Sequence, residues 1–117
     1  MKIKFRDKEL DLHYSNRMFI IYENIMGKGA SFEEQSYTAV ITLLYGALIG
    51  TLKYNNMETD VTYDEFMNWL DEQPRNTLSK FSEWFVNEHL ANNDLKDEVF
   101  EAEMKKEKKS KGSVKKQ

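Results

Sequence analysis

Two histidines, His13 and His89, are the side chains that could act as acids or bases near neutral pH. Neither lies in a recognisable motif, because Glu88-His89 lacks the second histidine of a zinc-binding helix. We interpret His89 as a helix-face residue and His13 as a solvent-facing residue at a strand end. No serine occupies a G-x-S-x-G turn, and no glycine-rich loop precedes a lysine. We therefore predict that the protein is not an enzyme.

An apparent calcium loop begins at Asp60, with Thr62 and Asp64 at its third and fifth positions. The sixth position, where glycine makes the sharp turn, is Glu65, and the twelfth is Asp71 in place of glutamate. A capping role for Thr62 at a helix start explains the same residues. The chain has no cysteine, which excludes thiolate metal sites and disulfides. We predict no metal and no cofactor.

Charge is distributed unevenly along the chain. Residues 1–104 carry 10 basic and 19 acidic side chains, whereas residues 105–117 carry 7 lysines and one glutamate. The tail has one apolar residue, Val114, so it cannot bury enough apolar surface to offset the conformational entropy that an ordered backbone loses. We therefore predict a flexible, disordered lysine-rich tail. An alternative function is a small regulatory protein that contacts nucleic acid through this tail. The acidic body would repel phosphates, which disfavours that alternative.

A chain of 117 residues with 40% hydrophobic residues supplies one core, so we predict a single domain over residues 1–104. The opening residues lack the apolar stretch of a signal peptide, so export is not indicated. The expected fold is mainly α, with four to five helices that follow an N-terminal β-hairpin.

The hairpin is predicted over residues 2–13, with strands at 2–6 and 9–13 around a turn at Asp7-Lys8. Both strands alternate apolar and polar residues, which places four side chains on one face: Ile3, Phe5, Leu10 and Leu12. Two strands alone are marginal in water, so this face must pack on helices.

Helix boundaries follow from capping residues. Ser15 or Asn16 can begin a first helix that Gly27 ends, and a capping box at Ser31 and Glu34 begins a second. A third helix follows Thr62 and stops before Pro74, and Asn76 or Thr77 begins a fourth. A weaker apolar period from Leu95 to Met104 predicts a last helix.

The run from Tyr37 to Leu52 contains no charged residue, which predicts a central, mostly buried helix. It falls short of the roughly 20 apolar positions that span a bilayer, so we expect no membrane segment. One face is bulky and the other is a seam of mostly small residues: Ala39, Leu43, Gly46, Ala47 and Gly50. Such a seam predicts close approach of another helix, from this chain or from a second copy.

The chain is rich in large amphipathic side chains, with two Trp, six Tyr, seven Phe and six Met. A body this small cannot hide all of them, and exposed Trp, Tyr and Met dominate partner surfaces. The candidate protein-binding residues are Tyr37, Tyr45, Gly46, Ile49, Gly50, Trp69 and Trp84.

Five segments in this order resemble the tail assembly chaperones of long-tailed bacteriophages, siphophages or their prophages. They are IKFRDKELDL, NRMFIIYENIMGK, YTAVITLLYGAL, TYDEFMNWLDE and LSKFSEWFVNE. The resemblance covers about residues 1–90. It rests on element order and loose patterns, with no catalytic signature.

The resemblance implies a protein without covalent chemistry that binds and solubilises the tape measure protein and helps recruit tail tube subunits. It also implies self-association into a homo-oligomer, a location in the cytoplasm of the bacterial host, and absence from the mature virion. An acidic body with apolar contact residues suits the shielding of an aggregation-prone helical client.

Overall fold

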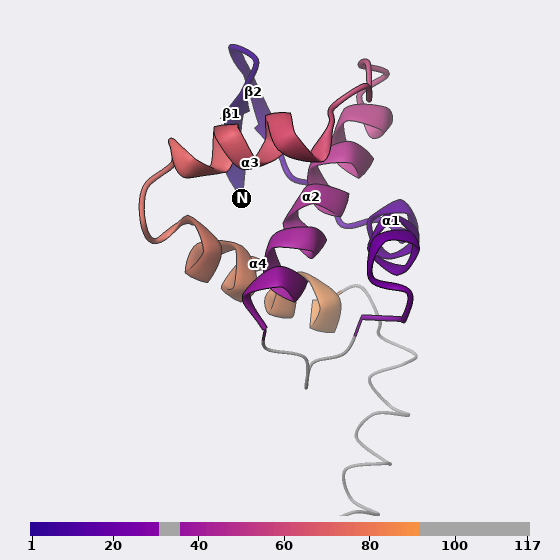
Figure 1. The fold of residues 1–117 in the computed structure, drawn as a ribbon. Coiled ribbons are helices and arrows are strands. Elements are labelled where there is room, and N and C mark those ends of the chain that lie inside the picture. Colours follow the sequence, from indigo (N-terminus) through magenta and orange to yellow (C-terminus); the bar gives the residue numbers. More distant parts are fainter. Residues whose placement is uncertain (31–35, 92–117) are drawn as a thin grey trace, which may run out of the picture. The chain divides into compact units, whose positions relative to one another are not determined.

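A computed structural model describes residues 1–30 and 36–91 (Figure 1). The chain divides into two units, Met1–Phe85 and Val86–Gln117. The first unit contains the hairpin, three helices and the start of a fourth helix, and it is the unit that carries the core. The predicted last helix, the lysine tail and the expected boundary after residue 104 lie outside the described residues.

The N-terminal hairpin pairs strand β1 (Lys2–Phe5) antiparallel to strand β2 (Lys8–Asp11), as predicted. The turn is Arg6-Asp7, one residue earlier than expected, since Phe5 pairs with Lys8. Both turn residues have positive φ, 50° and 62°. This geometry matches the twist of the strands, which explains why the loop closes there. The four predicted inward side chains are all buried: Ile3, Phe5, Leu10 and Leu12.

Helix α1 (Asn16–Met26) begins and ends where the sequence predicts. The Ser15 hydroxyl accepts a hydrogen bond from the Met18 amide at 3.3 Å, which satisfies a free donor of the first turn. Gly27 has a φ of 76°, and its amide donates to the Glu23 carbonyl at 2.8 Å. A glycine is needed there because the left-handed conformation penalises a Cβ.

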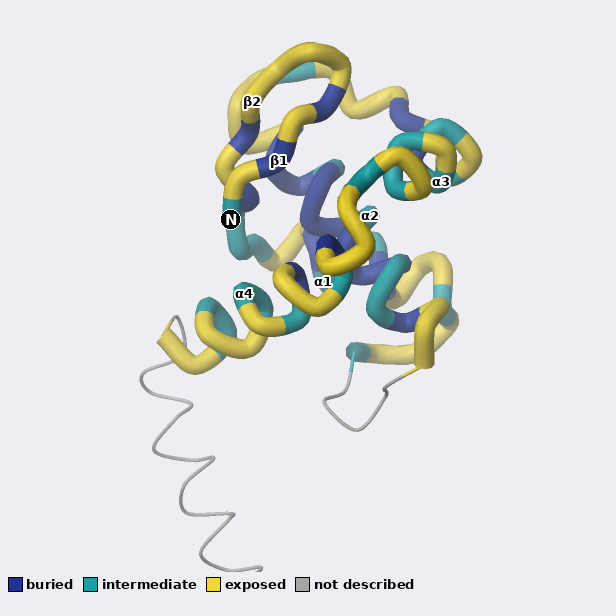
Figure 2. Tube along the Cα trace, turned by 90° about the vertical axis from the view of Figure 1, so that its left-hand side faces the viewer, coloured by how far each residue is buried: buried dark blue, intermediate teal, exposed yellow. Residues whose placement is uncertain are grey.

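Helix α2 (Tyr37–Tyr54) is the central helix, and ten of its residues are buried (Figure 2). It begins after Ser36, whose hydroxyl accepts from the Ala39 amide at 3.1 Å. The central helix therefore does not extend back to Ser31, because Ser36 is extended, with a ψ of 151°. The capping box expected at Ser31 and Glu34 lies in a part of the chain that the structure leaves undescribed.

Helix α3 (Tyr63–Asp71) begins at Thr62, whose hydroxyl accepts from the Glu65 amide at 3.0 Å. The capping interpretation of Thr62 is thus confirmed. Helix α4 (Thr77–Ala91) follows Pro74 and starts at one of the two expected positions. Of α4, residues up to Phe85 belong to the first unit.

The core of the first unit draws side chains from the hairpin and from all four helices. Its largest fully buried side chains include Tyr22 of α1, Phe66 of α3 and Phe81 of α4. The fold is therefore mainly α with an N-terminal hairpin, as predicted. Across residues 1–30 and 36–91, no helix combines the length and apolarity needed to cross a bilayer.

Candidate functional site

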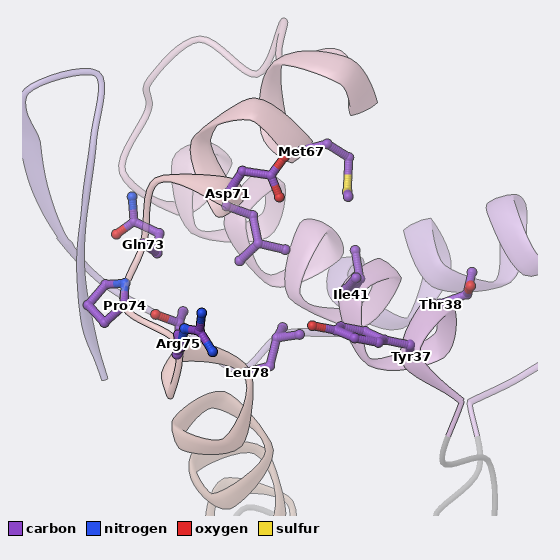
Figure 3. A pocket seen from close by; sticks show the side chains of 11 residues that line it. Tyr37, Thr38, Ile41, Met67, Asp71, Gln73, Pro74, Arg75 and Leu78 are labelled. Carbon is purple, nitrogen blue, oxygen red and sulfur yellow. The ribbon is translucent and has the colours of Figure 1, made fainter.

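An open pocket of about 660 Å³ lies between α2, α3 and the start of α4 (Figure 3). Its walls come from the first turns of α2, the last turn of α3, the connection that follows α3, and the first turn of α4. The lining residues are Tyr37, Thr38, Ile41, Met67, Leu70, Asp71, Gln73, Pro74, Arg75, Thr77 and Leu78.

Local structure determines how these walls meet. Pro74 lacks an amide proton and cannot continue α3, so the chain turns before it enters α4. The Thr77 amide donates to the Pro74 carbonyl at 3.0 Å, and Gln73 donates from its side chain to the Trp69 carbonyl at 3.0 Å. These bonds tie the connection to both helices, and Arg75 between them is exposed.

Four aliphatic or thioether side chains line the pocket. Ile41, Met67, Leu70 and Leu78 are each partly exposed and also pack on the buried core. Methionine has three rotatable bonds and a polarisable sulfur, so Met67 can adapt to differently shaped partners. Because these four side chains also pack on the core, the fold itself holds their partly exposed apolar surface in place.

The opening carries an exposed aromatic ring. Tyr37, in the first turn of α2, is 71% exposed although it borders apolar side chains. Figure 3 shows Tyr37 and Leu78 on one side of the opening and Met67 on the other. A tyrosine in such a position offers an apolar face and a hydroxyl to an incoming group. This is the one sequence-predicted binding residue that lines the pocket.

Two charged side chains also line the pocket. Asp71 ends α3, and Arg75 lies in the connection to α4. Both are exposed, and within residues 1–30 and 36–91 neither side chain has a hydrogen-bond or ion-pair partner. The Tyr37 hydroxyl is likewise unbonded among these residues. The rim therefore offers a negative, a positive and a hydroxyl group to a ligand.

Four other expected binding residues are engaged inside the chain. The Tyr45 hydroxyl donates to the Val61 carbonyl, and burial raises the pKa of Tyr45. The Trp69 indole donates to the Lys4 carbonyl at 2.7 Å and so joins α3 to the hairpin. Gly46 and Gly50 are buried on α2.

The small-residue seam of α2 packs against α1 of the same chain. A Cβ added at Gly46 would lie 2.6 Å from the Met18 carbonyl oxygen, and one at Gly50 would lie 2.7 Å from the Ser15 hydroxyl oxygen. The helix neighbour that the sequence left open is therefore α1. Ile49 and Trp84 are half-buried and pack beside the core, away from the pocket lining.

Sequence reasoning missed Met67, Asp71, Arg75 and Leu78 as site residues. A signal for part of the set is present, since Met67, Leu70 and Asp71 follow the i, i+3, i+4 spacing that places side chains on one helix face. The contribution of Arg75 had no such signal, because it depends on how the connection after Pro74 folds.

The histidines lie elsewhere. The His13 ring stacks on Tyr54 with centroids 3.8 Å apart, and its amide donates to the Thr51 hydroxyl at 2.9 Å. His89 lies on α4, as expected, in the second unit. No group of three or more His, Asp or Glu side chains that could hold a metal occurs in the described part of the chain.

The protein was compared with family models, with curated proteins and with solved structures, and none of the three comparisons found a match.

Proposed function

We propose that the protein is a non-enzymatic phage tail assembly chaperone that binds the tape measure protein and helps recruit tail tube subunits. The observation that carries this proposal is the open pocket that exposes Ile41, Met67, Leu70 and Leu78, with Tyr37 exposed at its edge. Apolar surface that a folded protein leaves open marks a site of contact with another molecule. The order of the elements, hairpin first and a central apolar helix, is what the resemblance to this chaperone family rests on.

Further apolar side chains outside the pocket support a role in binding polypeptides. Ile20 and Ile25 of α1 are 56% and 46% exposed, and Tyr54 at the end of α2 is 65% exposed. Aliphatic and aromatic groups of this kind supply the centre of protein interfaces. We further propose that the chaperone self-associates and acts in the cytoplasm of its bacterial host, without remaining in the mature virion.

Coexpression tests the proposal. The protein is produced together with the tape measure protein encoded beside it, and the tape measure protein is produced alone as the control. We expect a soluble complex that copurifies, and a tape measure protein that aggregates when the chaperone is left out. If the tape measure protein is equally soluble alone and does not copurify, the proposed function is wrong.

Self-association is measured separately. Light scattering on the isolated protein at micromolar concentration should report a particle heavier than 13.9 kDa. A particle of monomer mass at all accessible concentrations would contradict the homo-oligomer and leave client binding to be judged by the coexpression experiment.

A further inference from the structure

Thr77, in the first turn of α4, is a buried polar residue that lines the pocket between α2, α3 and α4 (Figure 3). Only 7% of the residue is exposed, and its hydroxyl makes no hydrogen bond within the described part of the chain. The buried hydroxyls of Thr42 and Thr51, by contrast, are bonded at 3.1 and 2.7 Å. A buried hydroxyl without a partner is unfavourable, so a ligand that accepts its proton would stabilise this position.

The same turn of α4 offers two backbone amides. The Thr77 amide donates to the Pro74 carbonyl at 3.0 Å, and the Lys80 amide also donates to a carbonyl upstream, at 2.9 Å. Between them, the Leu78 and Ser79 amides have no acceptor among the residues that the structure describes. Free amides at the start of a helix point out along its axis and carry the positive end of the helix dipole, so they suit an anion.

Arg75 adds a cationic group beside this turn. It comes two residues before Thr77, lines the same pocket, and has no carboxylate partner in the described part of the chain. Figure 3 shows Arg75 beside Leu78, whereas Asp71 lies on the side of Met67. The negative charge of the lining is therefore not at the start of α4. A planar guanidinium can bind a carboxylate or a phosphate through two parallel hydrogen bonds.

Apolar side chains adjoin these polar groups. Ile41, Leu70 and Leu78 line the same pocket, and each is partly exposed. The volume of the pocket is about 660 Å³, within the range of about 300 to 1,000 Å³ that is usual for sites of small organic ligands. An inorganic ion would occupy a small part of that space. An anion that carries a short apolar group would also cover the aliphatic side chains.

We propose that the start of α4 is a binding site for a small organic oxyanion, a carboxylate or a phosphate monoester, that carries a short apolar group. The oxyanion accepts hydrogen bonds from the Leu78 and Ser79 amides. It also accepts one from the Thr77 hydroxyl and pairs with the Arg75 guanidinium, while its apolar group lies against the aliphatic part of the lining. The inference goes beyond the proposed function and does not rest on it, because it concerns a small ligand and not a client polypeptide.

Titration of the full-length protein, followed by the NMR signals of its backbone amides, tests the site. The probes are inorganic phosphate, acetate, hexyl phosphate, hexanoate and the neutral hexanol. We expect the Leu78 and Ser79 signals to shift and saturate with the two hexyl anions, which should bind about tenfold or more tightly than phosphate and acetate. Hexanol should bind at least about tenfold more weakly than the hexyl anions, since it lacks the charge. The stronger of hexyl phosphate and hexanoate identifies the anion class. Equal binding of hexanol, or no shift at Leu78 and Ser79 with any anion at millimolar concentration, would overturn the inference.

Thr77→Val separates a role in binding from a role in folding. Valine keeps the shape but removes the hydroxyl, so the variant should bind the stronger hexyl anion about tenfold less tightly. Without ligand it should melt no lower than the original protein, because an unpartnered hydroxyl does not stabilise the fold. Thr38→Val changes an exposed threonine of the same lining and should alter the affinity less than about twofold. A Thr77→Val protein that binds the anion undiminished, or that melts well below the original, would contradict the site.

Arg75→Gln tests the charge and should weaken binding about three- to tenfold, by a factor that shrinks as salt is added. Arg17→Gln, an exposed arginine of α1 outside the lining, is the matched control and should change the affinity less than about twofold. Equal losses in both variants would mean that the anion binds elsewhere. Copurification of the tape measure protein is a separate measurement. Anion binding without copurification leaves this inference standing and the chaperone function wrong, and copurification without anion binding does the reverse.

Discussion

Gly46 of α2 lies against the backbone carbonyl of Met18 on α1, so closely that a Cβ at position 46 would stand 2.6 Å from that oxygen. Real Cβ atoms do not approach a backbone oxygen this closely, so any larger residue forces the two helices apart. The contact joins the first and second helices, and Met18 itself is fully buried. The packing of α1 on the central helix therefore depends on the absence of a side chain at position 46.

Gly46→Ala should destabilise the fold. Overpacking of a close contact costs about 1 to 3 kcal/mol, which exceeds the gain of up to about 1 kcal/mol in helix propensity. Gly29→Ala is the control, because a Cβ there would meet no atom within 4 Å. Urea unfolding measures both variants. A Gly46→Ala protein as stable as the original would show that α1 and α2 can separate without penalty.

The Glu65 carboxylate should make stability depend on pH. It accepts hydrogen bonds from the Arg6 guanidinium at 2.7 and 2.8 Å, and these bonds lower the pKa of Glu65 below its usual 4.5. A lowered pKa in the folded state means that the stabilisation is complete above about pH 4.5. It is lost as the pH falls through the lower folded-state pKa.

Thermal melts from pH 7 to pH 2 should therefore show a decline at the acid end that is smaller in Glu65→Gln. The pair is exposed, so added salt should shrink the difference between the two proteins. Identical pH profiles for Glu65→Gln and the original protein would mean that the Arg6 bonds do not contribute to folding in solution.

Trp69→Phe should lower stability by about 1 kcal/mol or somewhat more. The substitution keeps an aromatic ring against Phe5 and Phe66 but removes the indole that donates to the Lys4 carbonyl. Trp84→Phe is the matched control, since its indole has no hydrogen-bond partner among the described residues. Chemical denaturation should rank Trp69→Phe as the less stable protein, and the reverse order would contradict a structural role for this bond.

Thr51→Val should destabilise the junction between the hairpin and α2. The buried Thr51 hydroxyl accepts from the His13 amide and donates to the Ala47 carbonyl at 2.7 Å. Valine keeps the shape but leaves the His13 amide without its partner, which costs about 1 to 3 kcal/mol. Thr38→Val changes an exposed threonine on the same helix and should be close to neutral. Hydrogen exchange at the His13 amide should accelerate in Thr51→Val alone.

Local sequence signals located most of the described elements. Ser15, Gly27 and Thr62 marked helix ends because a cap acts through bonds to residues three or four positions away. Alternation in residues 2–12 identified the hairpin and its buried face. The turn differed by one residue because Arg6 and Asp7 adopt positive φ without a glycine, which composition does not reveal.

The site was harder to derive from the sequence than the fold. Tyr37 could be named as a surface aromatic, whereas Trp69 and Tyr45 looked equally suitable and are hydrogen-bonded within the chain. Which aromatic stays exposed depends on contacts between residues 16 or more positions apart, such as Trp69 with Lys4. Such contacts leave no periodic pattern along the chain.

Arg6 meets two demands at one position. Its backbone must adopt a left-handed turn, and its side chain must reach Asp60 and Glu65 across the hairpin end. Glycine or asparagine would suit the first demand better but would remove the second. An engineer who tightens this turn with Asn-Gly should therefore expect a better-formed ribbon that is less firmly attached to α3, which makes position 6 a compromise between local and long-range order.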